Sequence, residues 1–285
     1  MAVKTQRSPG APGAMLAVVA EEQRINVDMD EDGEVHGCDY GQIALYTARA
    51  PGKESGNEDC VAFLCFDDDR GVLLVADGMG GMPCGDEAAA LAITAMHESL
   101  LHAPRSDSGL RESILTGIDE ANRRIVELGV GAGSTLAAVE INGDVIRPYH
   151  VGDSMILVVG RRGKIKLYTV SHSPVGYAVE AGFLDATEAM SHEHRHIVSN
   201  TLGTSDMRVE MGPPLALARY DTVLLASDGL FDNFHVEEIA ERIRKGSLSD
   251  ILPQLVHETR HRMQHPEPQR PCKPDDLGII IFRRG

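Results

Sequence analysis

Apolar residues follow two periods along most of this 285-residue chain. Short apolar or alternating runs bounded by turn residues predict β-strands, and one pair of runs flanks Asn142-Gly143, a strong hairpin signal. The predicted strands are Ile43–Ala48, Val61–Phe66, Gly71–Ala76, Thr135–Ile141, Asp144–His150, Met155–Val159, Lys164–Val170, Thr222–Ala226 and Leu277–Phe282. Helical spacing predicts longer helices at Asp86–Leu101, Leu110–Leu128, Val236–Lys245 and Leu248–His265. Antiparallel strands with helices in pairs indicate an α+β fold and argue against a parallel βαβ sheet.

Residues 1–40 differ in composition from the rest of the chain. Pro and Gly are concentrated in residues 8–13, and Glu21–Asp39 is strongly acidic, so we predict a flexible N-terminal extension. The apolar run Ala14–Ala20 is too short for a membrane span and lacks signal-cleavage chemistry, and we assign it to this extension. We expect residues 41–285 to form one domain, within which residues 174–204 are a mostly polar excursion with one or two short helices.

The charge balance excludes some classes of partner. The chain has 27 Lys and Arg against 43 Asp and Glu, a net charge of −16. This acidity argues against nucleic acid and against anionic membrane surfaces, because both attract basic residues. No apolar stretch reaches the ~20 residues of a membrane span. The five cysteines form no Cys-x-x-Cys pair, which fits a reducing, cytoplasmic setting.

Carboxylates recur at the ends of the predicted strands. Asp77-Gly78, Gly152-Asp153 and Asp228-Gly229 follow strands, while Glu58-Asp59 and Asp275-Asp276 directly precede strands. An Asp-Gly pair alone is also the commonest hairpin turn. Neither Asp77-Gly78 nor Asp228-Gly229, however, is followed at once by a returning strand. Together the sites favour a shared carboxylate cluster.

Such a cluster has a chemical consequence. Several carboxylates in one pocket raise one another's pKa values or require cations. Oxygen ligands without accompanying Cys or His patterns favour magnesium, manganese or calcium over zinc. Two such ions ~4 Å apart would activate a bridging water and stabilise an in-line displacement at phosphorus.

Six short motifs occur in an order that resembles one known family. They are Gly56-Asn57-Glu58-Asp59, Val75-Ala76-Asp77-Gly78-Met79-Gly80-Gly81, Gly133-Ser134-Thr135, His150-Val151-Gly152-Asp153-Ser154, Ser227-Asp228-Gly229 and Pro274-Asp275-Asp276. Over residues 41–285 this order resembles the metal-dependent protein phosphatases, the protein phosphatase 2C-like family, and Asp-Gly-Met-Gly-Gly resembles its bacterial branch. The resemblance implies a β-sandwich of two antiparallel sheets flanked by helix pairs on both faces, in four layers (α-β-β-α).

The resemblance also implies roles for the matching residues. Asp77 would bridge two ions, Mg2+ or Mn2+, and Gly78 would add its backbone carbonyl. Asp153 would belong to a looser third metal site that shares Asp228. The full set of implied metal ligands is Glu58, Asp77, Gly78, Asp153, Asp228 and Asp275.

The implied reaction is hydrolysis of phosphoserine or phosphothreonine in proteins by a metal-activated water, without a phosphoenzyme intermediate. Asp77 and Asp228 would be its catalytic carboxylates, and the substrates would be those of a cognate serine/threonine kinase. We expect a cytoplasmic monomer that binds neither nucleic acid nor membrane. Residues 174–204 match in position the family's flap, a mobile element beside the cleft. The alternative is a surface loop without contact to substrate.

The chain departs from the family pattern where phosphate is bound. Glu54 occupies the position of a phosphate-binding Arg, and Lys53 or Arg49 could substitute for it, so we include Lys53 among the catalytic candidates. Further departures, in place of two His, an Arg and an Asn, are Met79, Met82, Met155 and Asp276. They leave open a catalytically weak or inactive pseudophosphatase that acts as a phosphoprotein-binding regulatory module. A hydrolase of small phosphates is a third hypothesis.

Two weaker patterns have alternatives of their own. His192, His194 and His196 would share one face of a strand and could bind a transition metal, but exposed loop histidines are commoner and no fourth ligand is evident. Cys84 precedes a predicted helix N-terminus, which lowers the pKa of a thiol. Redox sensing at Cys84 is therefore an alternative to an inert thiol.

Overall fold

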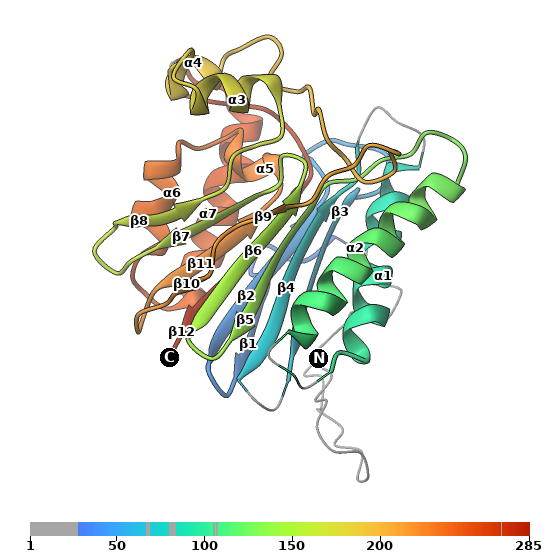
Figure 1. The fold of residues 1–285 in the computed structure, drawn as a ribbon. Coiled ribbons are helices and arrows are strands. Elements are labelled where there is room, and N and C mark those ends of the chain that lie inside the picture. The colour runs from blue at the N-terminus through green and yellow to red at the C-terminus, as the bar shows by residue number, and fades with distance from the viewer. Residues whose placement is uncertain (1–27, 67–68, 80–83, 105, 107, 269) are drawn as a thin grey trace.

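A computed structural model describes residues 28–285 except 67–68, 80–83, 105, 107 and 269. Within these residues, two six-stranded antiparallel sheets pack face to face, and helices cover both outer faces (Figure 1). The predicted four-layer sandwich is confirmed. Residues 1–27 of the expected extension over residues 1–40, which include its apolar run, lie outside the described residues, and so does Met82.

The first sheet has the order β1-β2-β12-β11-β7-β8. Its strands are β1 (Glu34–Cys38), β2 (Gly41–Ala48), β12 (Leu277–Arg284), β11 (Thr222–Ala226), β7 (Met155–Val159) and β8 (Ile165–Tyr168). The last strand, β12, lies between β2 and β11, so segments from both ends of the domain form the centre of this sheet.

The second sheet has the order β10-β6-β5-β4-β3, and β9 also pairs with β6. Its strands are β10 (Leu215–Ala216), β6 (Val145–Val151), β5 (Leu136–Asn142), β4 (Arg70–Asp77), β3 (Asp59–Cys65) and β9 (Glu210–Met211). The predicted hairpin is formed by β5 and β6, but Asn142 pairs with Val145, so the turn is Gly143-Asp144, one residue later than predicted.

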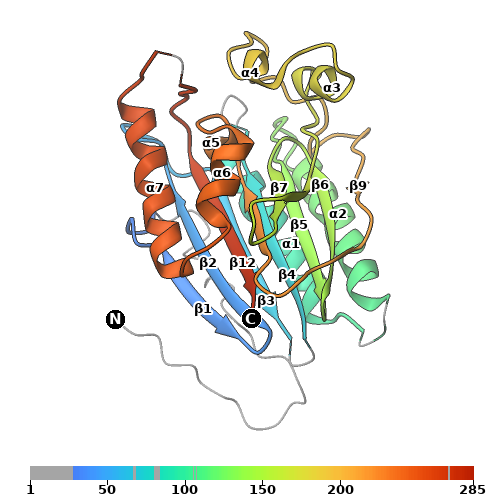
Figure 2. The same ribbon diagram turned by 90° about the vertical axis from the view of Figure 1, so that its left-hand side faces the viewer.

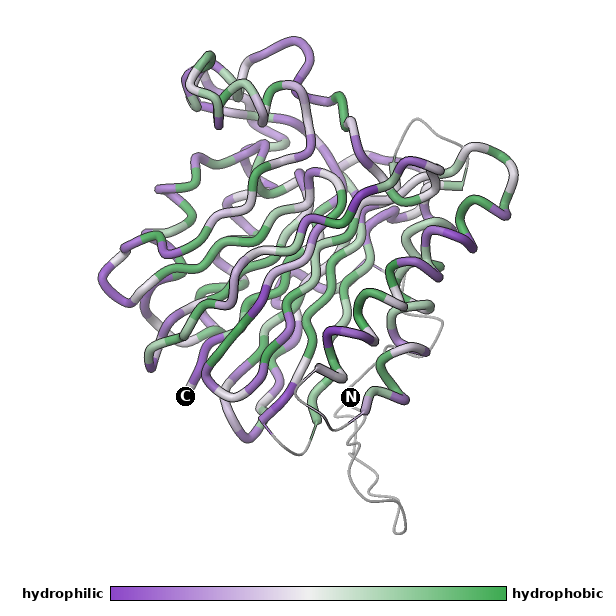
Figure 3. The backbone as a smooth tube through the Cα atoms, in the orientation of Figure 1, coloured by the Kyte–Doolittle hydropathy of each residue, from purple (hydrophilic) through white to green (hydrophobic). Residues whose placement is uncertain are grey.

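Three apolar layers hold these elements together, and hydrophobic residues follow the central strands (Figure 3). Helices α1 (Gly85–Leu101) and α2 (Gly109–Glu127) cover the second sheet, where the small side chains of Ala88 and Ala92 let α1 lie close to the strands. On the other side α5 (Asp228–Phe231), α6 (Val236–Ile243) and α7 (Leu248–Gln264) cover the first sheet (Figure 2). No helix in the described ranges is long and apolar enough to cross a membrane.

Residues 34–38 correct the predicted domain boundary. The predicted flexible extension includes them, but they form β1, which pairs in register with β2 from Glu34↔Leu45 to Cys38↔Gly41. Hydrogen bonding extends further toward the N-terminus, because the Met29 N–H donates to the Thr47 carbonyl (2.9 Å). The folded domain therefore begins before residue 34.

The predicted excursion between β8 and β9 contains two short helices, α3 (Pro174–Glu180) and α4 (Ala186–Ala189). Ser173 and Asp185 cap them through side-chain oxygens that accept backbone N–H groups. Both helices stand apart from the two sheets (Figures 1 and 2). This part of the prediction is confirmed.

Candidate metal centre

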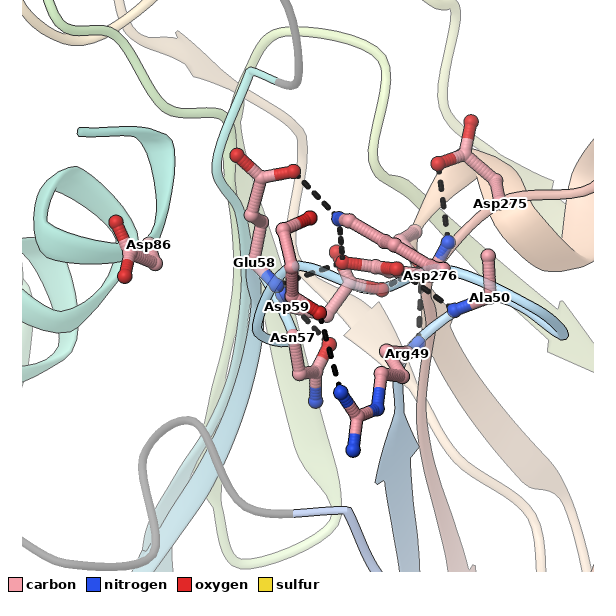
Figure 4. A network of polar contacts seen from close by, with 12 residues as sticks. Arg49, Ala50, Asn57, Glu58, Asp59, Asp86, Asp275 and Asp276 are labelled. Carbon is pink, nitrogen blue, oxygen red and sulfur yellow. Dashed lines mark hydrogen bonds and ion pairs between the residues drawn. The ribbon is translucent and has the colours of Figure 1, made fainter. Parts of the chain in front are cut away.

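The carboxylates predicted from strand ends meet at one end of the sandwich. Asp77 ends β4, and Asp59, at the start of β3, lies directly opposite it in the ladder. Asp228 begins α5, with only Ser227 between it and the end of β11. Asp275 precedes β12 (Figure 4). Their mutual charge interactions, in which Asp153 takes part, show that the sequence order folds into one cluster.

Burial and like charge act together on these groups. Burial raises the pKa of Asp77 well above its usual value, and the charges of Asp59 and Asp228 raise it further. The pKa of Asp228 is likewise raised by burial and then by Asp275. For Asp153, burial and then Asp232 raise the pKa to about 6. A cluster of this kind has a strong affinity for cations.

Two lysine ammonium groups lie among the carboxylates. Lys273 Nζ contacts a carboxylate oxygen of Asp228 and lies 2.9 Å from Asp275 Oδ2 and 3.0 Å from Asp232 Oδ2. Burial lowers the pKa of Lys273, but the three carboxylates outweigh this effect and raise it overall. The ammonium therefore remains charged and partly balances the cluster.

Lys53, the predicted substitute for a phosphate-binding Arg, is the second of these lysines. Its Nζ donates to Glu58 Oε2 (2.5 Å) and Asp276 Oδ2 (2.6 Å). Arg49 donates to Asp28 Oδ2 (2.7 Å), and Glu54 is exposed. Both candidate cations are thus engaged with carboxylates near the site.

Asp276, the departure from the usual Asn, joins the loop before β3 to the start of β12. Its Oδ1 accepts the Ala50 N–H (2.8 Å), and its Oδ2 accepts the Glu58 N–H (2.6 Å) as well as the Lys53 ammonium (Figure 4). A carboxylate provides these acceptors without an amide donor that would need a partner of its own. Asp276 therefore fixes the backbone that carries Glu58.

Met155 is another departure from the family pattern, in place of an Arg. Its side chain is buried in the apolar layer beneath α5, α6 and α7. The residue therefore contributes to the packing of this layer.

Glycines beside Asp77 and Asp228 permit close backbone contacts. A Cβ added at Gly78 would lie 2.0 Å from the Gly85 carbonyl oxygen, at the start of α1. A Cβ at Gly229 would lie 1.9 Å from the Asp276 carbonyl oxygen. Only glycine fits at either position, because real Cβ atoms do not approach backbone oxygens so closely.

The Gly133-Ser134-Thr135 motif holds the backbone of Asp77. The Ser134 hydroxyl donates to the Asp77 carbonyl (3.0 Å), and the Asp77 N–H donates to Thr135 Oγ1 (3.1 Å). The motif thus fixes the end of β4, from which the Asp77 side chain extends.

The carboxylate oxygens of this cluster suit divalent cations that prefer oxygen ligands. Asp59 Oδ2 accepts the Ser227 hydroxyl (2.6 Å), but Asp59 Oδ1 is buried without a hydrogen-bond partner among the described residues. A buried carboxylate oxygen without a partner destabilises the fold unless a cation or a water molecule binds to it. The residues present therefore suit Mg2+ or Mn2+.

The excursion is linked to two segments of the candidate centre, through His172 on one side and through Arg195 on the other. His172 Nδ1 accepts the Gly152 N–H (3.1 Å) and the Asn200 side-chain amide (2.8 Å). Its Nε2 therefore carries the proton and donates to Glu210 Oε2 (3.1 Å). At the other side of the excursion, Arg195 Nη2 donates to the Cys272 carbonyl (3.3 Å).

Among the described residues, His150, His172 and Glu210 are a group whose ligand atoms converge, within 4.8 Å of one another. The two rings are stacked with centroids 4.3 Å apart, and the His150 Nε2 donates to the Val170 carbonyl (2.9 Å). Both nitrogens of His172 are already engaged in hydrogen bonds, so this ring offers no free lone pair to a metal and the group connects loops.

The sequence hypothesis for His192, His194 and His196 stays without support, since they do not converge in this way in the described structure. Cys84 is exposed directly before α1, and its proposed redox role stays a prediction.

Comparison with known proteins identifies the family. A family model described as protein phosphatase 2C matches residues 51–265. The chain belongs to the protein phosphatase 2C family. It is a metal-dependent phosphatase of the bacterial type, as the motif order implied.

Relatives and solved structures agree with this assignment. The protein phosphatase PhpP of Streptococcus pneumoniae is 29% identical over 212 residues, which are 72% of this chain and 85% of the relative. The serine/threonine phosphatase of S. agalactiae superposes with a TM-score of 0.73 at 29% identity, over 86% of this chain and 99% of that one. A similar structure is the catalytic domain of PstP in complex with two manganese ions, with a TM-score of 0.68 at 22% identity over 85% and 97% of the two chains.

Two members of the cluster were missed from the sequence. Asp232 lies four residues after Asp228, a spacing that places both on one face of a helical turn. Lys273 is separated from Asp275 only by Pro274. The acidic spacing was a usable signal for Asp232, whereas nothing local indicates that Lys273 contacts α5.

Proposed function

We propose that this phosphatase hydrolyses phosphoserine and phosphothreonine in proteins. The observation that carries the proposal is the cluster of strand-end carboxylates in a chain of the protein phosphatase 2C family. PhpP is named as a protein phosphatase, and Stp of Listeria welshimeri, 29% identical over 208 residues, is named as a serine/threonine phosphatase; both support the same substrate class. Its substrates would be proteins phosphorylated by a cognate kinase.

We assign the metal ligands to Glu58, Asp77, the Gly78 carbonyl, Asp228 and Asp275, with Asp153 at a third, looser site. Mg2+ or Mn2+ bound there would lower the pKa of a bound water and offset the charge of the phosphoryl group. The chain's own residues would fix this arrangement: Asp276 orients the Glu58 loop, and Thr135 orients Asp77.

Phosphate recognition would require a change at Lys53. Its ammonium is engaged by Glu58 and Asp276, and a cation that occupies Glu58 would compete with it. A lysine released in this way has a flexible stem and three donors for a phosphate oxygen. We therefore keep Lys53 as the candidate that takes the role of the missing Arg.

Residues 174–204 would act as the flap. One supporting contact is Arg195, which donates to the carbonyl of Cys272, in the segment that carries Asp275. The other is indirect: Asn200 donates to His172, whose ring also accepts the N–H of Gly152, next to Asp153. An unattached surface loop would not need contacts with both segments.

The deciding experiment measures phosphate release from a phosphothreonine peptide. We expect turnover with Mn2+, loss of turnover with a chelator, and loss of at least ~100-fold in Asp77→Asn. Lys164→Met is a surface control, because Lys164 is exposed and outside the cluster. Absence of turnover from folded, metal-loaded protein that still binds the phosphopeptide would instead support the pseudophosphatase hypothesis.

A further inference from the structure

Two cysteines lie at the end of the sandwich that is remote from the carboxylates. Cys38 is the last residue of β1, and Cys65 is the last residue of β3. These strands are the edges of the two sheets on the same side of the sandwich. Both side chains are partly exposed and pack against the apolar layer between the sheets.

The strand register brings the two thiols together. β1 and β3 both run away from the metal centre, and the rings of His36 and Phe63 are in contact, with centroids 5.2 Å apart. Side chains two residues further along each strand extend from the same face. Those side chains are Cys38 and Cys65, so they face one another across the edge of the sandwich.

The pairing of β2 supports the same alignment. The Thr47 hydroxyl donates to the Asp59 carbonyl (3.1 Å), which aligns the end of β2 with the start of β3. Six residues back along β2 is Gly41, the ladder partner of Cys38, and six residues forward along β3 is Cys65.

The two thiols affect one another and differ in reactivity. The neighbouring Cys65 thiol raises the pKa of Cys38, and burial adds to the increase. The Cys38 thiol lowers the pKa of Cys65, against the opposing effect of burial. Cys65 is therefore the better nucleophile of the pair, because the thiolate is the reactive form.

We propose that Cys38 and Cys65 form a reversible disulfide between the edge strands of the two sheets when the protein meets hydrogen peroxide. The Cys65 thiolate attacks one peroxide oxygen, giving a sulfenic acid and, after proton transfer, one water. The Cys38 sulfur then displaces the sulfenic oxygen, which leaves as a second water after taking up a proton. Overall, two thiols lose two hydrogens and two electrons, and one peroxide becomes two waters.

The bond would act mainly on stability. It closes the loop from Cys38 to Cys65, which contains β2 and the segment carrying Glu58, and it ties β1 to the second sheet. Closing a loop of this size reduces the conformational entropy of the unfolded chain and would raise Tm by about 5–10 °C. Reduction with dithiothreitol would reverse the increase.

The test uses the full-length protein, first reduced and then treated with one equivalent of hydrogen peroxide in metal-free buffer. We expect free thiols to fall from five to three, Tm to rise, and digestion to yield a disulfide-linked peptide pair containing Cys38 and Cys65. Dithiothreitol should restore five thiols and the original Tm.

Variants separate this pair from general oxidation. Cys65→Ser and Cys38→Ser should each abolish both the linked peptide and the Tm increase. Cys272→Ser, which removes another partly exposed thiol, should retain them, with thiols falling from four to two. The proposal is overturned if the wild type forms no such linked peptide, or if the Tm increase persists in Cys65→Ser.

Discussion

Lys273 provides the carboxylate cluster with a positive charge of its own. Its ammonium lies within 3.0 Å of oxygens from Asp228, Asp232 and Asp275, where these carboxylates would otherwise repel one another. The same carboxylates are proposed to hold a divalent ion. The lysine and the ion therefore compete for Asp228 and Asp275.

Replacing Lys273 should change stability and metal affinity in opposite directions. In Lys273→Met the metal-free protein should lose about 1–3 kcal/mol, because three carboxylates remain without their counter-ion. Mn2+ should bind about 10-fold more tightly, because a competitor has been removed. Thermal unfolding in chelator and calorimetric Mn2+ titration measure the two effects. Lys164→Met, an exposed lysine without a carboxylate partner in the described structure, should change neither.

The raised pKa of Asp153 predicts that the stability of the metal-free protein depends on pH. The pKa of this carboxyl is raised to about 6 in the folded state, against ~3.9 when unfolded. Its stabilising contribution is therefore fully present below pH ~4 and is lost as the pH rises through about 6, a change of roughly 3 kcal/mol.

Comparison with Asp153→Asn isolates this contribution. The variant should match the wild type in Tm near pH 4 and exceed it at pH 7.5, both in chelator. A Tm difference that stays constant across this range would contradict the predicted titration.

Sequence spacing predicts the carboxylates of this centre but not their counter-ions. Asp77 and Asp228 stand out because each follows a buried strand and precedes a glycine. Lys273 is one basic residue among many, and its role arises only when the segment before β12 folds against α5. Contacts of this kind have no local signature.

At the scale of elements, the centre depends on close contacts between strand ends and helix starts. Gly78 allows the end of β4 to meet the first residue of α1, and Gly229 allows α5 to meet the segment before β12. These contacts set the distance between the segments that carry Asp77, Asp228 and Asp275.

Gly78→Ala should therefore be severely destabilising. The new Cβ would meet a backbone oxygen at 2.0 Å, which requires α1 or β4 to shift, at a cost of about 3 kcal/mol or more. Urea unfolding in chelator measures this loss without a contribution from metal. Gly56→Ala is the control, because a Cβ there has no neighbour within 4 Å, and comparable losses in both variants would disprove the steric explanation.

The proposed flap, residues 174–204, bears an exposed aromatic side chain. Phe183, between α3 and α4, is 88% exposed. If the flap contacts substrate, Phe183→Ser should raise KM for a phosphoprotein about 3–10-fold and leave KM for p-nitrophenyl phosphate unchanged. Val126→Ser, an exposed apolar residue on α2, should alter neither KM. Equal effects on both substrates would argue against a substrate-binding flap.

The elements that were predicted and those that were missed differ in burial. Strands such as β4 and β11 are buried along their length and appear as continuous apolar runs. β1 is a partly exposed edge strand in an acidic stretch, and β9 and β10 have two residues each. Their pairing is determined by neighbouring strands, so local hydrophobicity does not reveal them.

At the scale of the whole molecule, β1 belongs to the folded domain. It pairs with β2 and covers Phe63 of the other sheet through His36. A chain starting at residue 41 should therefore expose the edge of β2, unfold at a lower temperature and aggregate more readily. A chain starting at residue 28 retains the described contacts and is the control. Equal Tm values for both chains would show that β1 adds no stability.

The lysines within the carboxylate cluster also bear on the order of events during biosynthesis. Sites that depend on an ion to balance their charge fold only when that ion is supplied. Here Lys53 and Lys273 provide positive charge from within the chain. We therefore expect the newly made polypeptide to complete its fold before it acquires metal. The cell would then hold a reserve of finished but inactive enzyme, and the supply of manganese or magnesium would set how much of that reserve works.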